Sequence, residues 1–399
     1  MIVPLFADAQ QNQRLRDRDP DLAAAKAVTG ELQQARFHYG PFYFLSRIRV
    51  SDVGFSSSIY VPSSDTGDTL SFAVEAPQRL YFVPHKKTIF TAEVTPAYNF
   101  FTGSGESGQL DYSARGDAHL MFNHLYVNGY VLLSDQLRAH VSDVNRLATV
   151  ETGEVGLAGE LKYSSRTSML FKASRSSIEY PEDRYQPDAV PMNLLDRTDT
   201  RTRLAFHHKT FPLTSLFVAG EISDHDFDRA SYKDSRRTWY SGGGTYDTGR
   251  SQIRVEAGPL KLDFASPDEE DYSGIGANVG ASRSNGRWLY SARADRDVGF
   301  SILLDNNFYV STAVSGKIDY DATRRLMLHA GSAWQRDDYV RLYLGQDRED
   351  TISFTWVGFT YNMRRLQAGL DAGWYEREST IGIDNDSGIR WVIRLSYTL

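Results

Sequence analysis

SGIRWVIRLSYTL, residues 387–399, alternates between two kinds of side chain. From Ile389 onward, one parity carries only apolar and aromatic residues, and the other carries Arg390 and Arg394 with Val392 and small polar residues. A period of two places the two sets on opposite faces of a β-strand. A soluble sandwich wets one face, whereas a transmembrane barrel turns one face to lipid and the other to an aqueous lumen. The pattern favours the barrel, with Trp391 and Ile393 toward lipid and both arginines toward the lumen.

The composition of the chain agrees with a barrel and excludes other classes. A chain of 399 residues is long enough for about sixteen to eighteen strands of roughly ten residues. No apolar run reaches the roughly 18 residues that a transmembrane helix needs. The absence of cysteine excludes a disulfide scaffold and a thiolate metal site, and the net charge of −7 gives no support to nucleic-acid binding.

The N-terminal region differs from the rest of the chain. Residues 1–9 contain the short apolar run IVPLF followed by Ala-Asp-Ala, which looks like a truncated secretory signal, although an ordinary terminus fits as well. Residues 10–34 are polar and charged, with a short helix-forming patch. We therefore expect residues 1–36 to be a periplasmic tail and residues 37–399 to be one barrel domain.

From Phe37 onward, alternating segments recur and predict eighteen antiparallel strands. Their ranges are 42–50, 69–83, 88–101, 109–124, 127–140, 155–163, 167–178, 199–209, 213–223, 236–246, 251–264, 273–282, 287–296, 307–319, 324–336, 350–362, 365–377 and 388–399. The connections alternate between short turns and long polar loops, which is typical of outer-membrane barrels with the short turns in the periplasm. An even number of strands then places both termini on the short-turn side. The predicted location is the bacterial outer membrane, with membrane lipid and lipopolysaccharide as neighbours.

Parity sorts each strand into a lipid face and a lumen face. Leu328 and Trp334 then face lipid while His329 faces the lumen. The arginines predicted to line the lumen and the substrate path are Arg47, Arg49, Arg115, Arg201, Arg203, Arg254, Arg287, Arg293, Arg325, Arg365, Arg390 and Arg394. With the lysines, this count gives about sixteen cations against about ten anions on the lumen face. Such an excess favours anions, but arginine–carboxylate pairs that only brace the wall are the alternative reading.

Two further expectations concern the wall itself. The charges of the strand 251–264 change parity after Gly258-Pro259, which predicts a β-bulge there and places Lys261 and Asp263 on the lumen face. Aromatic residues near strand ends are expected to form two interfacial girdles. Those residues are Phe42, Tyr98, Phe100, Trp239, Trp288, Trp334, Trp374 and Tyr397.

The sequence offers little catalytic or metal-binding chemistry. Residues 105–108 only approach a nucleophile motif, and His207 and His208 are adjacent and so point to opposite faces of a strand. Residues 384–388 resemble the start of a calcium loop without its closing glutamate, and the acidic stretch 266–272 reads as a solvated loop. We therefore predict no enzyme activity, no cofactor and no metal site.

Two long segments resemble a known family. GPFYFLSRIRVSDVGFSSSIYV (40–61) and the stretch 174–229 are similar to the β-barrel porins found in exopolysaccharide and capsule clusters. The shared features are a long loop with an Asp-Arg-Tyr turn, a strand rich in Arg and Leu, and a Thr-Phe-Pro-Leu-Thr turn. The chain end also resembles the C-terminal signal of outer-membrane barrels, with Leu399 at the final position. The resemblance implies polysaccharide export, with polysaccharide and periplasmic export proteins as partners, and transfers no binding residue.

Three functions therefore remain open at the level of sequence. The first is a pore that exports polysaccharide, the second is a general or anion-preferring diffusion porin, and the third is an outer-membrane enzyme. About eighteen strands argues against the enzyme, because such enzymes tend to be narrow barrels. A constricting loop, for which the segment 178–198 is the candidate, would distinguish a gated pore from an ungated one.

Overall fold

The computed structural model describes residue 32 and residues 37–57, 68–101, 108–140, 146–181, 192–303, 306–340, 347–381 and 385–398. The predicted tail 1–36, apart from residue 32, therefore lies outside the described residues. Among the described residues, no helix is long and apolar enough to cross a membrane. The elements are β1 (Phe37–Tyr39), β2 (Phe42–Ser57), β3 (Asp68–Glu75), β4 (Gln78–His85), β5 (Thr88–Phe101), β6 (Gln109–Met121), β7 (Leu125–His140), β8 (Arg146–Lys162), β9 (Thr167–Glu179), η1 (Met192–Leu195), β10 (Arg197–Phe211), β11 (Thr214–Phe227), η2 (Ser231–Lys233), β12 (Ser235–Asp247), β13 (Ser251–Phe264), β14 (Tyr272–Asn285), β15 (Trp288–Phe300), β16 (Phe308–Asp321), β17 (Leu326–Tyr339), β18 (Glu349–Asn362), β19 (Leu366–Ser379) and β20 (Asp386–Thr398).

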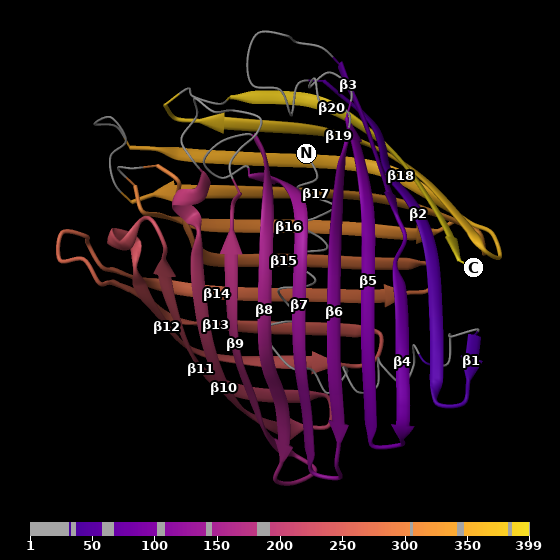
Figure 1. The fold of residues 1–399 in the computed structure, drawn as a ribbon, viewed down its shortest axis with the longest axis horizontal. Coiled ribbons are helices and arrows are strands. Elements are labelled where there is room, and N and C mark those ends of the chain that lie inside the picture. The colour runs from indigo at the N-terminus through magenta and orange to yellow at the C-terminus, as the bar shows by residue number, and fades with distance from the viewer. Residues whose placement is uncertain are drawn as a thin grey trace.

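The strands form one closed antiparallel barrel (Figure 1). Each strand pairs with its neighbours in sequence, and β20 closes the wall by pairing with β2, from Arg47 opposite Thr398 to Ser56 opposite Arg390. Both β3 and β4 pair with β2 on one side and β5 on the other, so they are two halves of one wall strand, separated at Ala76-Pro77. β1 pairs only with β2 and adds nothing to the wall. The described wall therefore has the predicted eighteen strands.

The alternation seen in the sequence accounts for the two faces of the wall. On β20, Ile389, Trp391, Ile393 and Leu395 are exposed, whereas Arg390 is buried on the other face. Apolar side chains are likewise exposed on one face of the strands around the barrel, from Phe90 on β5 to Val357 on β18. A continuous apolar belt of this kind is stable only in a bilayer, because in water it would expose far more apolar surface than a soluble monomer does.

Short turns join the strands at one rim and longer loops at the other, as predicted. Gly249 and Gly286 in two of the short turns have φ angles of 77° and 63°, a region that L-residues with side chains seldom adopt. Of the residues predicted for the aromatic girdles, Trp288, Trp334 and Trp374 are exposed on the outer face, as that prediction requires. Trp239 is an exception, because its ring is buried on the inner face of β12.

The predicted β-bulge in β13 is wrong. The pairing of β13 with β14 continues without a shift through Gly258 opposite Gly276 and Pro259 opposite Ile275. Toward β12 the pairing stops at Leu260 and resumes at Ala257 in the same register. Proline has no N–H to donate, so Pro259 interrupts hydrogen bonds without inserting a residue. Parity is therefore kept, and Lys261 and Asp263 lie on the outer face near the long-loop rim.

Candidate functional site: the lumen of the barrel

Nine of the twelve predicted arginines lie on the inner face of the wall. They are Arg47, Arg49, Arg115, Arg201, Arg203, Arg254, Arg293, Arg390 and Arg394. Most exposed apolar residues of the same strands have the opposite parity, as Leu204 and Phe206 do relative to Arg203; Phe211 and Leu289, at the short-turn ends of β10 and β15, are exceptions. By this alternation, the nine side chains point to the face opposite the exposed apolar side chains.

The other three, Arg287, Arg325 and Arg365, do not lie on the wall. Each is exposed in a short turn, immediately before β15, β17 and β19 respectively. The Arg287 guanidinium donates a hydrogen bond to the carbonyl oxygen of Ala322, in the neighbouring turn, at 3.3 Å. The predicted strands began one or two residues too early, which is enough to move these arginines from the lumen to the rim.

Sequence reasoning also missed several inward-facing charges. Arg237 and Glu221 were inside predicted strands, and parity relative to the exposed Tyr240 and Ile222 would have placed both on the inner face. The inward-facing cations of the described wall are Arg47, Arg49, Arg79, Arg115, Lys162, Lys172, Arg197, Arg201, Arg203, Arg237, Arg254, Arg293, Lys317, Arg377, Arg390 and Arg394. The inward-facing anions are Glu75, Glu93, Asp111, Asp117, Glu154, Glu160, Asp199, Glu221, Glu256, Asp295, Asp297, Asp319, Asp337, Asp350 and Asp371. The two sets nearly balance, so the predicted excess of positive charge is absent from the described wall.

A buried network of charges occupies the inner face of β10 to β13. The Arg203 guanidinium lies 2.8 Å from a Glu256 carboxylate oxygen and 3.4 Å from one of Glu221. Arg237 approaches Glu221 at 2.7 Å, and the Ser241 hydroxyl donates to Glu256 at 2.6 Å. All four charged side chains are nearly inaccessible to solvent. Because a buried charge is stable only when it is paired and hydrogen-bonded, this network fixes four neighbouring strands to one another.

A second group of charges lies on the inner face of β17 to β20. The Asp371 carboxylate contacts both the His329 imidazole and the Arg394 guanidinium. Nearer the long-loop rim, the buried Asp350 carboxylate is 2.6 Å from Arg348 and 2.8 Å from Arg377. Both carboxylates therefore connect side chains of more than one element.

The tip of the β15–β16 hairpin folds into the barrel. The pairing between β14 and β15 ends at Ala277 opposite Arg296, whereas β15 and β16 stay paired up to Phe300 opposite Phe308. The Phe308 ring lies 5.5 Å from the rings of Phe264 and Tyr272, which are on the inner faces of β13 and β14. The hairpin tip therefore lies over these two strands on the lumen side.

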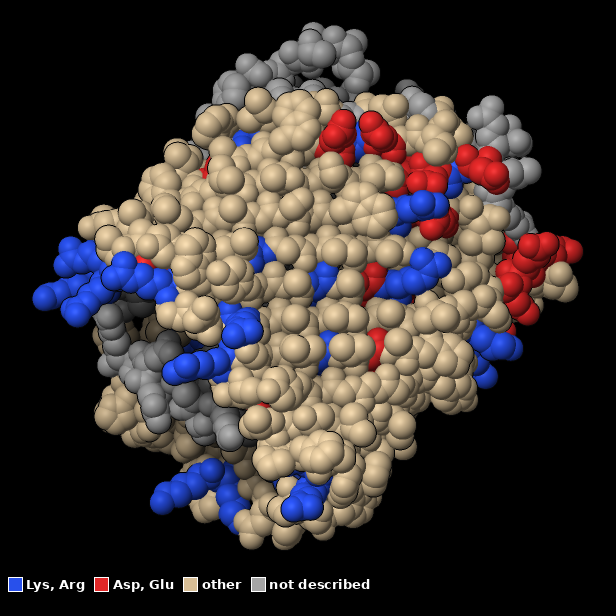
Figure 2. All heavy atoms as spheres, turned by 180° about the vertical axis from the view of Figure 1, so that it is seen from behind, with Lys and Arg blue, Asp and Glu red and all other residues tan. Residues whose placement is uncertain are grey.

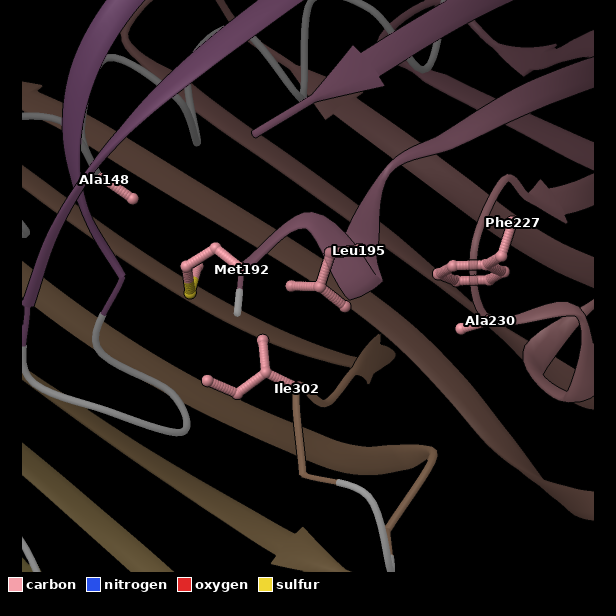
Figure 3. Packing of buried hydrophobic residues seen from close by; sticks show 6 residues of the cluster. All are labelled: Ala148, Met192, Leu195, Phe227, Ala230 and Ile302. Atoms are coloured by element: carbon pink, nitrogen blue, oxygen red, sulfur yellow. The ribbon is translucent and has the colours of Figure 1, made fainter. Parts of the chain in front are cut away.

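The folded tip meets other loops in an apolar cluster. Met192 and Leu195 of η1 face Ile302, which follows β15, with Ala148 of β8 and Phe227 at the end of β11 on either side (Figure 3). The Lys233 ammonium of η2 donates to the Ser301 carbonyl oxygen, and Arg237 lies 2.8 Å from Asp297 on the same tip. Of the predicted constricting segment 178–198, η1 belongs to this cluster and residues 182–191 lie outside the described residues. The hairpin tip, which the sequence analysis did not single out, is a second part of the cluster.

Asp196, directly after η1, joins the two ends of the segment that connects β9 to β10. Its carboxylate accepts a hydrogen bond from the backbone N–H of Tyr180 at 2.6 Å. Burial nevertheless raises the pKa of Asp196 above its usual range. The two ends of the segment between β9 and β10 are therefore joined by a side chain as well as by the strand pairing.

The two members of many inward-facing ion pairs differ in their exposure. Side-chain exposure is 34% for Arg201 against 0% for its partner Glu221, and 25% for Arg254 against 2% for Glu256. The same order holds for Lys162 with Glu160, Lys317 with Asp319 and Arg394 with Asp371. Three inward pairs of the described residues reverse it: Arg79 with Glu93, Arg197 with Asp199 and Arg237 with Asp297. The charges of the wall balance, but the charge that a solute meets is mostly positive.

Comparison with known proteins identifies the fold of the chain. No family model and no curated protein matches it. Among solved structures, the outer membrane protein OpdK from Pseudomonas aeruginosa has a TM-score of 0.51 at 10% identity over 89% of this chain and 98% of that chain. A BenF-like porin from Pseudomonas fluorescens gives the same values, and OccAB3 from Acinetobacter baumannii has a TM-score of 0.51 at 10% identity over 89% and 99%. The chain thus has the closed eighteen-stranded barrel fold of bacterial outer-membrane porins.

Proposed function

We propose that the chain is a diffusion pore of the bacterial outer membrane that passes small polar solutes and prefers anions. The apolar belt and the porin fold support a pore in that membrane. The difference in exposure within the inward-facing ion pairs supports the preference for anions. This second observation carries the proposal, because the charge count alone would favour neither sign.

The physical argument rests on distance from the solute. At Arg201, Arg254 and Arg394, a guanidinium reaches the lumen while its carboxylate partner lies behind it against the wall. A solute in the lumen is nearer to the cation than to the anion, and the low-dielectric wall strengthens the field of the nearer charge. Rings of such side chains select by sign in other channels. The result is a moderate preference, which salt screens.

The comparisons agree with a diffusion pore better than with polysaccharide export. One similar structure, OpdK from Pseudomonas aeruginosa, was crystallised with vanillate, a small organic anion; it has a TM-score of 0.50 at 11% identity. We propose small organic anions of this kind as solutes for the present chain as well. Polysaccharide export, which the sequence resemblance implied, finds no support among the matched structures.

Planar-bilayer recordings test the proposal. With a gradient of KCl across the bilayer, the reversal potential of wild-type protein should indicate preference for chloride, and the preference should weaken as the Debye length falls below about 10 Å above 0.1 M salt. The triple variant Arg49→Gln, Arg201→Gln, Arg254→Gln removes exposed inward cations and should shift the reversal potential toward zero or beyond. The matched control is Arg175→Gln with Arg236→Gln, which removes exposed arginines of the outer face. Cation preference in the wild type, or equal shifts in both variants, would contradict the proposal.

A further inference from the structure

Exposed cations gather at the short-turn rim of the barrel. Figure 2 shows the outer face on the side of β10 to β19, with Lys and Arg mainly along one margin and Asp and Glu mainly along the opposite one. On three consecutive turns, the exposed cations are Arg287 before β15, Arg324 and Arg325 before β17, and Arg364 and Arg365 before β19. We call these five residues the basic rim. Asp321, at the end of β16, is the exposed carboxylate beside them.

Within the described residues, no carboxylate neutralises the basic rim. The one side-chain bond that the structure shows for it is from Arg287 to the carbonyl oxygen of Ala322. None of its five arginines forms an ion pair with a described residue. This contrasts with the outer face at the long-loop rim, where Arg236 pairs with Asp224 at 2.6 Å and Arg336 with Asp338 at 2.7 Å. The described part of the chain thus leaves the charges of the short-turn rim to another partner.

The aromatic girdle fixes the depth of the basic rim in the membrane. Trp288, which follows Arg287, is exposed on the outer face, and its ring lies 4.4 Å from that of Tyr320 and 6.1 Å from that of Tyr290. Clusters of Trp and Tyr in barrel walls lie at the level of the lipid headgroups. One residue spans only about 3.3 Å of strand. The arginines therefore lie at, or just beyond, the depth of the lipid phosphates.

We propose that the basic rim binds the headgroups of anionic phospholipids, such as phosphatidylglycerol, in the leaflet on the periplasmic side. Guanidinium groups bind phosphate oxygens through paired, charge-assisted hydrogen bonds. The cations are spread along an arc of three turns, with their strands in lipid on the outer side. An arc at phosphate depth fits a row of separate headgroups better than one compact acidic protein. This inference depends on the barrel lying in a bilayer and not on the proposed transport of anions.

The experiment measures which lipids surround the protein. The full chain is reconstituted in phosphatidylcholine bilayers with spin-labelled phosphatidylglycerol or spin-labelled phosphatidylcholine, and the motionally restricted fraction of each label is compared. At low salt, wild-type protein should favour phosphatidylglycerol, with about fivefold tighter association for each basic side chain beside a headgroup. The preference should fall as salt is raised.

Two variants assign the preference to the rim. The rim variant should lose most of the preference for phosphatidylglycerol; it combines Arg324→Gln, Arg325→Gln, Arg364→Gln and Arg365→Gln. Arg287 is left intact because it contacts the Ala322 carbonyl oxygen. The control removes four exposed cations at the long-loop rim through Arg175→Gln, Arg229→Gln, Arg236→Gln and Lys261→Gln, and should keep the preference. Circular dichroism and heat-dependent gel mobility verify that each variant is folded. No preference in the wild type, as an acidic soluble partner would predict, or an equal loss in both variants overturns the proposal.

Discussion

Replacing Arg203 by methionine should destabilise the barrel far more than the same replacement of Arg201. Arg203 is almost fully buried and faces two carboxylates, Glu256 at 2.8 Å and Glu221 at 3.4 Å, which are themselves buried. Removing one partner of a buried pair costs about 3–5 kcal/mol, because the remaining charge is left without compensation. Here Glu221 keeps Arg237 and Arg201, and Glu256 keeps Arg254, so we expect the lower end, about 3 kcal/mol. That is roughly a 150-fold change in the equilibrium constant of unfolding.

Arg201 is the matched control, because it lies on the same strand and face and approaches the same Glu221. Its side chain is 34% exposed, and its guanidinium lies 3.6 Å from Glu221 and donates to the Ser223 hydroxyl at 3.4 Å, so its loss should cost less than about 1 kcal/mol. Urea unfolding in lipid vesicles, followed by tryptophan fluorescence, gives both free energies. The double variant Arg203→Met with Glu256→Gln should be more stable than the sum of the single losses implies. Equal effects of the two arginine variants would refute the claim that the buried charge network stabilises strands β10 to β13.

Three further predictions concern the wall of the barrel and the apolar cluster around η1. Gly358→Ala should lower the free energy of unfolding by about 1–3 kcal/mol in the same urea assay, because the new Cβ would overlap with Asp371 Oδ1 and lie 2.5 Å from the Leu370 carbonyl oxygen. Gly280→Ala is the control, because a Cβ at that position meets nothing within 4 Å. The chain has no native cysteine, so a single cysteine can be introduced at one position and labelled with a fluorophore. Labels in place of Trp391 or Ile393 should be quenched by lipid-soluble reagents, and a label in place of Arg394 by aqueous reagents. The reverse pattern would mean that the strand register is wrong. Leu195→Ala should loosen the cluster around η1 at a cost of about 2–5 kcal/mol of packing and increase current fluctuations in single-channel recordings, whereas unchanged noise would show that the cluster does not line the conducting path.

The wall of this protein could be predicted from the sequence because each strand carries its own signal. A strand that faces lipid on one side and water on the other must alternate, and the short turns mark its ends. The parity of Arg390 and Trp391 on β20, or of Leu328 and His329 on β17, is therefore readable without any neighbour. Strand ends are less sharply marked. An error of one or two residues there was enough to place Arg287 in the lumen instead of in a turn.

The inner architecture could not be predicted because it depends on contacts between segments far apart in sequence. The tip of the β15–β16 hairpin does carry a local signal, the apolar run VGFSILL at 298–304, but nothing in that run shows which strands it packs against. Its inward fold follows from where Phe308 finds an apolar surface, on Phe264 and Tyr272. In β13 the sequence was misleading, since Pro259 interrupts the hydrogen bonds to β12 without changing the register. Whether an irregular residue inserts into a strand or only weakens its pairing is decided by the neighbouring strands.

In the structure, the two functions considered for the lumen arginines, bracing of the wall and selection of anions, do not exclude each other. Bracing of the wall and selection of anions were alternatives as long as only the charges were counted. In the structure, Glu221 braces Arg203 and Arg237 inside the wall, and the same carboxylate anchors the exposed Arg201. A carboxylate held against the wall fixes the direction of the long arginine side chain. Without that carboxylate, the side chain would lose more conformational entropy each time it binds a solute. The same ion pairs can therefore stiffen the barrel and hold positive charge toward the lumen. Replacing Glu221 by glutamine should accordingly affect both stability and selectivity, whereas replacing Arg201 should affect selectivity alone.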